Sequence, residues 1–262
     1  MKAHRIGAVV LRQAYEARHN LDRVTDALYW PVIDVLLWGF MSLYISRQTS
    51  AGPHIASYLL GMAILWALFR SFQRDIAVAF LSDVWSRNLI GLFSTPLSIQ
   101  EYVTALVLIN LLKAFAGMLV AGLVAWACYS FDIFPALPAL LPHLGILVLF
   151  AVAVGIFITG LIFRFSTRIQ SLTWSITGLI MPFSCVFYPV GALPAAIRPL
   201  AFALPTTYAF EGMRAVLAGA PIRYSYVALG YGLSVCYLAG AAFAFTRLFM
   251  AARASGLLVK IE

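Results

Sequence analysis

The sequence predicts an all-α integral membrane protein in which six transmembrane helices form a single domain over residues 1–262. Three observations support this fold class. Of the residues, 63% are hydrophobic and 11% are charged, whereas soluble domains carry about 25% charged residues. The apolar residues form segments of about 20, the length that a membrane-spanning helix needs. Most basic residues lie in the short connections between these segments, as expected for a polytopic membrane protein.

An N-terminal amphipathic helix is predicted within residues 1–24, before the first span. Its apolar side, at helical spacing, consists of Ile6, Val10, Ala14, Ala17 and Leu21. Its polar side consists of Arg12, Glu16, His19 and Arg23. This pattern suits a helix lying on a membrane surface that carries anionic lipid. A solvated basic terminus is the alternative interpretation.

The first span is predicted at about 28–46 and the second at about 55–72. Asp34 lies inside the first span, where a carboxylate costs about 2.5 to 3.5 kcal/mol on an insertion scale. Asp34 is therefore either a residue of a transport pathway or an interfacial carboxylate paired with a nearby arginine. Both interpretations stay open at this stage.

The segment 73–97 is predicted to be a cytoplasmic link between the second and third spans. Asp83 and Arg87 are four residues apart and can pair on a helix. Ser98 and Glu101 have the spacing of a capping box that opens the third span. An ordinary intracellular loop with a salt bridge is the alternative.

The third span is predicted at 101–129 and contains Lys113, a second pathway candidate for which Asp34 is a conceivable partner. The proline-rich segment 131–142 is predicted to lack regular secondary structure. The fourth span, at about 144–163, carries a stripe of small residues that favours close helix contact. The stripe consists of Ala151, Gly155 and Thr159.

The fifth span begins near residue 171, and the last span covers about 226–250. Between them, prolines recur every five to seven residues in an apolar stretch, so no long helix can form. Such backbone must be sheltered at membrane depth, which predicts a re-entrant helical hairpin at 187–221 on the outer side. Thr206 or Thr207 can cap a short helix there. Glu211 and Arg214, three residues apart on that helix, can pair.

Known catalytic and nucleotide-binding motifs are missing from the sequence. There is no G-x-x-x-x-G-K-[ST] loop, no H-E-x-x-H, no C-x-x-C and no G-x-S-x-G. The three cysteines lie in different apolar segments, and the four histidines are scattered and expected at surfaces. The net charge of +8 belongs to short loops and does not indicate nucleic acid. We therefore predict that the chain is not an enzyme and holds no metal.

Two series of residues stand out along the chain. The first series is Phe80, Leu81, Asp83, Trp85, Ser86, Arg87, Asn88, Leu89, Pro96 and Leu97. The second is Phe187, Tyr188, Pro189, Leu193, Pro194, Pro199, Leu204, Pro205, Tyr208, Glu211 and Arg214. Both series resemble the permease subunits of ABC transporters of the type-2 exporter family. Many relatives carry Glu at the position of Asp83, which is a conservative difference.

The resemblance implies a role for each series. In the first, a coupling helix docks on an ATPase subunit through Asp83, Val84, Trp85, Ser86, Arg87, Asn88 and Leu89. In the second, an outer gate is formed by Phe187, Tyr188, Pro189, Pro194, Pro205, Tyr208, Glu211 and Arg214. The Glu211–Arg214 pair has two interpretations, one that holds the short helix together and one that acts as a gate latch.

The resemblance also implies the partners and the location. A separate ATP-binding cassette subunit would bind ATP and Mg²⁺, and a second permease copy, identical or paralogous, would complete the pathway among membrane lipids. The expected location is the bacterial inner membrane. The excess of arginine and lysine in alternate connections places both termini in the cytoplasm. The implied activity is export of an amphipathic substrate, such as a drug, a lipid or a lipid-linked glycan.

Two other functions remain open from the residues alone. An ion-coupled secondary transporter would need a charged relay across the membrane, for which Asp34 and Lys113 are the candidates. An integral-membrane enzyme acting on lipids would need a cluster of acidic or histidine residues at one interface.

Overall fold

The computed structural model describes residues 2–19, 21–48, 53–86, 88, 91–92 and 94–254. These residues form helices and connecting segments, and the described part contains no strand. The α-helices are α1 (Ala3–His19), α2 (Leu21–Gln48), α3 (Pro53–Trp85), α5 (Ile99–Tyr129), α6 (Leu137–Phe165), α7 (Leu172–Ile180), α8 (Arg198–Phe202), α9 (Pro205–Leu217) and α10 (Tyr224–Ala254). The short 3-10 helices are η1 (Phe134–Ala136), η2 (Ser166–Ile169), η3 (Met181–Phe183) and η4 (Val190–Ala192).

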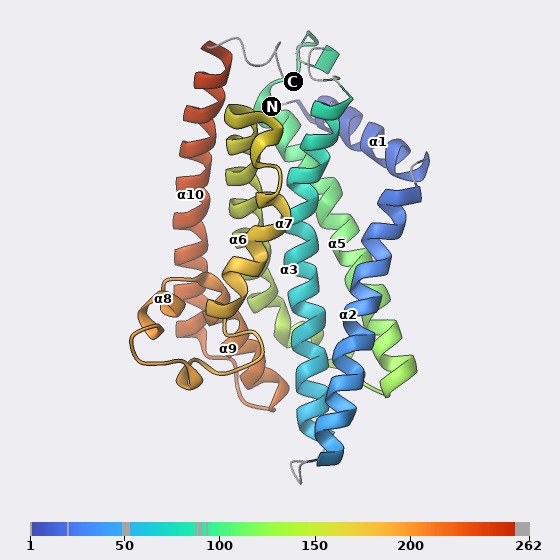
Figure 1. The fold of residues 1–262 in the computed structure, drawn as a ribbon, viewed down its shortest axis with the longest axis vertical. Helices are drawn as coiled ribbons and strands as arrows, with labels where there is room; N and C mark the ends of the chain where they lie inside the picture. The colour runs from blue at the N-terminus through green and yellow to red at the C-terminus, as the bar shows by residue number, and fades with distance from the viewer. Residues whose placement is uncertain are drawn as a thin grey trace.

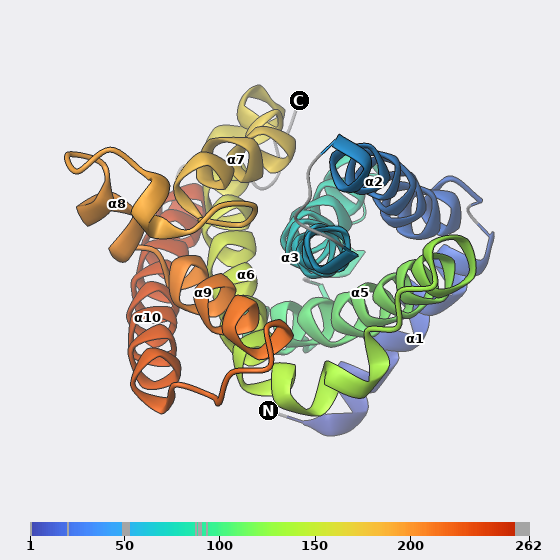
Figure 2. The same ribbon diagram turned by 90° about the horizontal axis from the view of Figure 1, so that it is seen from below.

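The long helices run side by side as a bundle (Figure 1). Helix α1 lies across one end of the bundle, which we call the α1 end, and α8 and α9 lie at the other, which we call the α9 end. Helices α2, α5 and α7 run from the α1 end, and α3, α6 and α10 run back toward it. Viewed along the bundle, α10 and α7 flank α6, and α2 and α5 flank α3 (Figure 2).

Within the part of the chain that the structure describes, four helices are long and apolar enough to cross a membrane. Their candidate spans are Tyr29–Gln48, Ile99–Tyr129, Phe134–Phe165 and Tyr224–Ala252. Helix α7, extended by η3, is apolar but shorter, over Leu172–Phe183. The chain is therefore a multi-pass membrane protein, and four of its predicted spans coincide with candidate spans of the structure.

Helix α3 is one continuous helix of 33 residues. The second span was predicted to end at Phe72, but α3 continues through the first half of the predicted link as far as Trp85. The reason is local, because residues 73–85 include neither proline nor glycine and nothing in them stops the helix.

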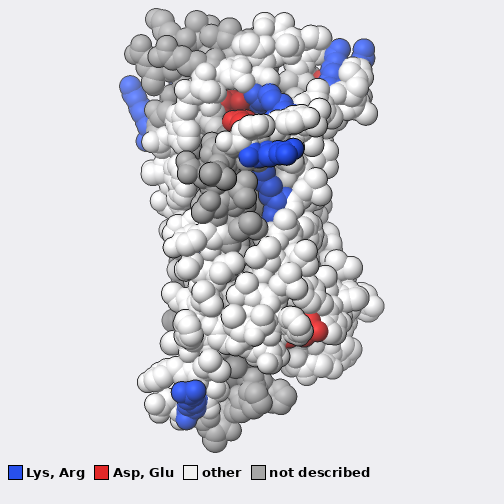
Figure 3. Space-filling model, turned by 90° about the vertical axis from the view of Figure 1, so that its right-hand side faces the viewer, with Lys and Arg blue, Asp and Glu red and all other residues white. Residues whose placement is uncertain are grey.

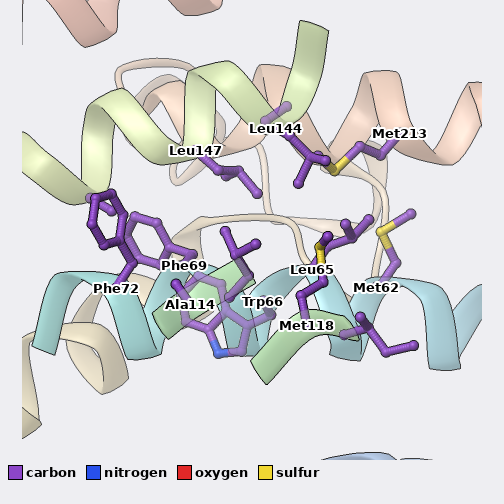
Figure 4. Close-up of a cluster of buried hydrophobic side chains, with 14 of the residues drawn as sticks. Met62, Leu65, Trp66, Phe69, Phe72, Ala114, Met118, Leu144, Leu147 and Met213 are labelled. Carbon is purple, nitrogen blue, oxygen red and sulfur yellow. The ribbon is translucent and has the colours of Figure 1, made fainter. Parts of the chain in front are cut away.

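The main core lies where α3 meets α5, α6 and α9 (Figure 4). Helix α3 contributes more of the large side chains of this core than any other helix does. Trp66 stacks on Phe69, whose ring in turn stacks on Phe150 of α6. At the α6 contact, a Cβ atom on Gly155 would lie 3.0 Å from Cβ of Ile76 and 3.2 Å from the carbonyl oxygen of Gln73. The small-residue stripe of α6 therefore allows the close helix contact that the sequence predicts.

Local signals at the start of α5 are confirmed. The hydroxyl oxygen of Ser98 accepts a hydrogen bond of 3.2 Å from the amide of Glu101. In return, the Glu101 carboxylate accepts one of 3.0 Å from the amide of Ser98. These reciprocal bonds form the predicted capping box.

Three expectations are wrong. The segment 131–142 is not irregular, since it contains η1 and the start of α6. Pro138 lies in the first turn of α6, where a missing amide proton breaks no hydrogen bond. His143 is fully buried instead of lying at a surface. Its imidazole fills space left by Gly212 of α9, where a Cβ atom would lie 2.0 Å from Nε2 of His143.

The third wrong expectation concerns α1, which ends at His19 instead of reaching residue 24. Its buried side chains are Val9 and Gln13, whereas Ala14 of the predicted apolar side is exposed. Ile6 and Val10 are partly buried against the second core cluster. The side chains of Ala17 and Leu21 lie outside the described residues. The buried side of α1 is therefore rotated from the predicted side, because it follows the contact with α3 and α5.

Candidate functional site

Two polar clusters lie at opposite ends of the bundle, and the two sequence series supply Asp83 to the first and Glu211 and Arg214 to the second. We call the first the Asp83 cluster, formed by Lys2, Arg5, Arg12, Asp83, Glu101 and Tyr102. We call the second the Arg214 cluster, formed by Tyr58, Glu211, Arg214 and the backbone of residues 185–190.

The Asp83 carboxylate is buried and fully engaged. Arg12 of α1 donates two hydrogen bonds to it, of 2.8 Å to Oδ1 and 2.7 Å to Oδ2. The Tyr102 hydroxyl of α5 donates a third, of 2.5 Å, to Oδ2. A buried carboxylate needs such partners, because its desolvation is otherwise uncompensated. Burial alone would lower the pKa of the Arg12 guanidinium, but the hydrogen bonds and charge of Asp83 outweigh it and raise that pKa.

Glu101 attaches the start of α1 to the start of α5. The backbone amide of Lys2 donates a 2.7 Å hydrogen bond to its Oε1 atom. Arg5 lies 3.7 Å from its Oε2 atom and also donates to the carbonyl oxygen of Pro96. Between α1 and the segment 92–97 lies a cavity of about 300 Å³, which Arg5 and Arg12 line together with Leu92 and Pro96. Helix α1 is thus joined to the predicted link through polar contacts on α3, α5 and the link itself.

The predicted coupling residues divide into buried and exposed members. Asp83 and Val84 are buried, whereas Trp85, Ser86 and Asn88 are exposed at the α1 end. Arg87 and Leu89 lie outside the described residues, so the Asp83–Arg87 pair stays a prediction. The Asp83 carboxylate itself faces Arg12 and Tyr102.

The two pathway candidates lie within the bundle. The Asp34 carboxylate of α2 forms an ion pair with Arg70 of α3, as the interpretation with a paired arginine predicts. Lys113 is half-buried on α5. On the face that Figure 3 shows, lysine and arginine gather mainly toward the α1 end.

The Arg214 cluster connects the proline-rich stretch to α9 and α3. Arg214 pairs with Glu211 at 2.7 Å, which confirms the predicted pair. Its Nη2 atom donates hydrogen bonds of 2.7 Å and 2.9 Å to the carbonyl oxygens of Cys185 and Tyr188. Its Nε atom donates to the Tyr58 hydroxyl of α3. Glu211 in turn accepts a 2.7 Å hydrogen bond from the amide of Val190.

The chain around Cys185 depends on these contacts. Cys185 has φ of 53°, in the left-handed region that side chains other than glycine rarely adopt. Its side chain is buried, and burial raises the pKa of its thiol. Because this conformation costs free energy, it persists only where surrounding contacts hold it, and Arg214 supplies one at its carbonyl group.

The other predicted gate residues surround this cluster. Phe187 stacks on Trp38 of α2, with ring centroids 3.9 Å apart. The Tyr188 hydroxyl donates to the carbonyl oxygen of Pro182. Tyr208 contacts the ring of Tyr226. The three predicted prolines differ, since Pro205 is buried at the start of α9 and Pro189 and Pro194 are exposed.

The predicted threonine cap is wrong. Helix α9 begins at Pro205, its N-cap is Leu204, and no side chain caps it. Thr207 instead donates a 2.6 Å hydrogen bond to the carbonyl oxygen of Ala201, and Thr206 donates one of 3.1 Å to Ser184. A proline at the first helical position removes one of the amide protons that a cap would bind, so the threonines fix the preceding turn.

Sequence reasoning missed the partners contributed by distant helices. Arg12, Tyr102 and Tyr58 complete the two clusters, and Trp38 stacks on Phe187. No local spacing in the sequence relates these residues to their partners. Among the described residues, no group of three His, Cys, Asp or Glu side chains could hold a metal ion.

A family model described as ABC-2 type transporter matches residues 15–218. The matched segment includes Asp83 and Tyr102 of the first cluster and all of the Arg214 cluster. No curated protein matches the chain.

Proposed function

Because the chain belongs to the ABC-2 type transporter family, we propose that it is the permease subunit of an ATP-driven exporter of an amphipathic substrate. Membership in this family implies pairing with an ATP-binding cassette subunit. In this proposal ATP and Mg²⁺ bind that separate subunit, and the permease needs no cofactor of its own. A second permease copy, identical or paralogous, completes the pathway. The family match is the observation that carries the proposal.

Six membrane spans are part of the proposal. Four are the candidate spans of α2, α5, α6 and α10. The second span is α3, which has 33 residues and carries charged side chains in its second half. The fifth span is α7 extended by η3. The alternating directions of these six helices support the count. In this proposal both termini lie in the cytoplasm and the membrane is a bacterial inner membrane. The even number of spans and the distribution of arginine and lysine support this orientation.

The ATPase subunit docks on the exposed end of α3 and on the segment that follows it. Trp85 is 52% exposed. Because large aromatic side chains are enriched at protein interfaces, this exposed ring supports a contact with a partner. Ser86 and Asn88 are exposed beside it. In this view Asp83 acts from inside, because its bonds to Arg12 and Tyr102 fix the end of α3 on which the docking surface lies.

The stretch 187–221 forms the outer gate as a re-entrant hairpin. Two observations support this hairpin. The stretch is apolar, and its prolines divide it into the short helices α8 and α9. Apolar backbone of this kind is tolerated at membrane depth only where other protein shelters it. The Arg214 cluster holds the closed position of this hairpin against α3. The aromatic pair Trp38–Phe187 holds it against α2.

The experiment is coexpression and reconstitution with a candidate ATP-binding cassette ATPase from the same organism. We expect the two chains to copurify and Trp85→Ala to weaken copurification at least tenfold. Trp126→Ala is the matched control, because Trp126 is 58% exposed on α5 near the opposite end of the bundle. The complex should hydrolyse ATP faster with one class among lipids, lipid-linked glycans and drugs. Transport by the purified permease alone, driven by a proton gradient, would contradict the proposal and favour a secondary transporter.

A further inference from the structure

A cavity of about 550 Å³ lies between α6, α7 and α10, apart from both polar clusters. Ile176 and Ile180 of α7 line one wall, and Gly240 of α10 lines another. Leu204, which immediately precedes α9, lines it as well. The volume is within the range of about 300–1,000 Å³ that is common for small-ligand sites.

The cavity exists because two helices diverge. Helix α7 packs against α3 and α6, whereas α10 packs against α6 and α9. Helix α7 is also short, since it ends at Ile180 and the chain turns through η3. Small residues on α10 leave the remaining space open. At Gly240, a Cβ atom would meet no other atom within 4 Å.

The lining selects an apolar ligand. No charged side chain lines the cavity. The Tyr237 hydroxyl, its most polar group, already donates a 3.3 Å hydrogen bond to the carbonyl oxygen of Ala203. A polar ligand would therefore lose its hydration without gaining partners. Apolar cavities of this kind exclude water and accept hydrocarbons.

The surroundings identify which hydrocarbon. Helices α6 and α10 are both candidate membrane spans, over Phe134–Phe165 and Tyr224–Ala252. The lining side chains of these helices lie well inside those spans, so the open side of the cavity faces the acyl chains of the bilayer. Phe157, on the lining, is 41% exposed. A second copy of this chain would present the packed side chains of a helix, whereas a flexible acyl chain can enter a cavity of about 550 Å³.

We propose that this cavity binds one acyl chain of a bilayer phospholipid. The cavity touches the gate stretch at Leu204, but it lies apart from the Arg214 cluster and from the ATPase contact. Binding would fill the space between α7 and α10. It would therefore fix the distance between these two helices, which are the fifth and last spans.

The test uses the full chain in nanodiscs made with a phosphatidylcholine that carries a diazirine midway along one acyl chain. After illumination, crosslinked peptides are mapped by mass spectrometry. We expect crosslinks concentrated on the α7 and α10 residues that line the cavity. Crosslinks spread evenly over the lipid-facing sides of α5 and α10, with none enriched at the cavity, would overturn the proposal.

Gly240→Phe provides a second readout, because its side chain would enter the cavity without a clash. We expect it to lower crosslinking at the cavity at least fivefold. Gly232→Phe is the matched control, since Gly232 lies on the same helix, also has open space around its Cβ position and does not line the cavity. Equal crosslinking in the three proteins would overturn the proposal. So would a Gly240→Phe protein that changes its oligomeric state while its cavity crosslinks persist, since that result identifies a second copy as the occupant.

Discussion

The guanidinium of Arg12 on α1 and the carboxylate of Asp83 on α3 form two parallel hydrogen bonds across 71 residues of sequence, of 2.8 and 2.7 Å. This bidentate geometry is the strongest that an arginine and a carboxylate adopt. It attaches the first helix to the end of α3 on which the proposed docking surface lies.

The Arg12–Asp83 pair predicts strong non-additivity in a double-mutant cycle. Arg12→Leu alone should lower the free energy of unfolding by about 3 kcal/mol, because it leaves the buried Asp83 carboxylate without its charged partner. Asp83→Leu should lower it by less, because the Arg12 side chain that it leaves is 28% exposed. The double variant should lose less than the sum of the two single losses. Unfolding by SDS in mixed micelles measures these values. Arg18→Leu, at an exposed position of α1, is the control. Strict additivity would show that the pair contributes no coupling.

Tyr102→Phe removes a hydroxyl that donates to the same carboxylate. The aromatic ring and its packing stay, so the loss reports the hydrogen bond alone. We expect a loss of about 1.5 to 3 kcal/mol in the free energy of unfolding, the usual contribution of a hydrogen bond to a charged group. The same SDS titration measures it. No loss of stability would mean that Arg12 alone compensates the carboxylate.

The Arg214 cluster predicts that the thiol of Cys185 is protected by a distant side chain. Lysine at position 214 cannot bond the carbonyl oxygens of Cys185 and Tyr188 and the Tyr58 hydroxyl at the same time, because it lacks the planar guanidinium of arginine. Arg214→Lys should therefore speed maleimide labelling of Cys185 at least tenfold, measured with Cys128 and Cys236 replaced by serine. Arg223→Lys, in the exposed connection before α10, should leave the rate unchanged. An unaltered rate in Arg214→Lys would show that other contacts hold this segment.

Gly155 predicts a steric limit at the contact of α6 with α3. Gly155→Leu places atoms where Ile76 and the Gln73 backbone already lie, and we expect it to destabilise the protein by about 2 kcal/mol or more. Gly178→Leu on α7 is the comparison, because its Cβ position is open. Thermal unfolding in detergent, followed by circular dichroism, distinguishes the two. Equal midpoints would mean that α6 can move away from α3 without loss.

The sequence predicted features that depend on neighbouring residues. Hydropathy located the candidate spans, because hydrocarbon imposes a length and a composition on each helix. The capping box of Ser98 and Glu101 and the pair of Glu211 and Arg214 were predicted because three residues along a helix fix which side chains meet. The extension of α3 to Trp85 could also have been predicted from the lack of breakers in residues 73–85.

The remaining features depend on tertiary packing. Arg12 meets Asp83, and Arg214 meets Tyr58, only because helices distant in sequence lie side by side. The burial of His143 follows from a glycine on another helix. Thr206 and Thr207 were assigned to a cap because their residue type favours one, but they lie in the first turn of α9, which already begins at Pro205. No local pattern contains this information.

Helix α3 carries Asp83 near one end and Tyr58 near the other, with no proline between them. At about 1.5 Å per residue, these side chains are roughly 37 Å apart along a single rod. Both polar clusters therefore lie on one unbroken helix. If α3 tilts as a rigid body, a movement at its docking end is transmitted to the gate without an intervening hinge. A small rotation at the docking end then displaces the gate end of the helix by ångströms.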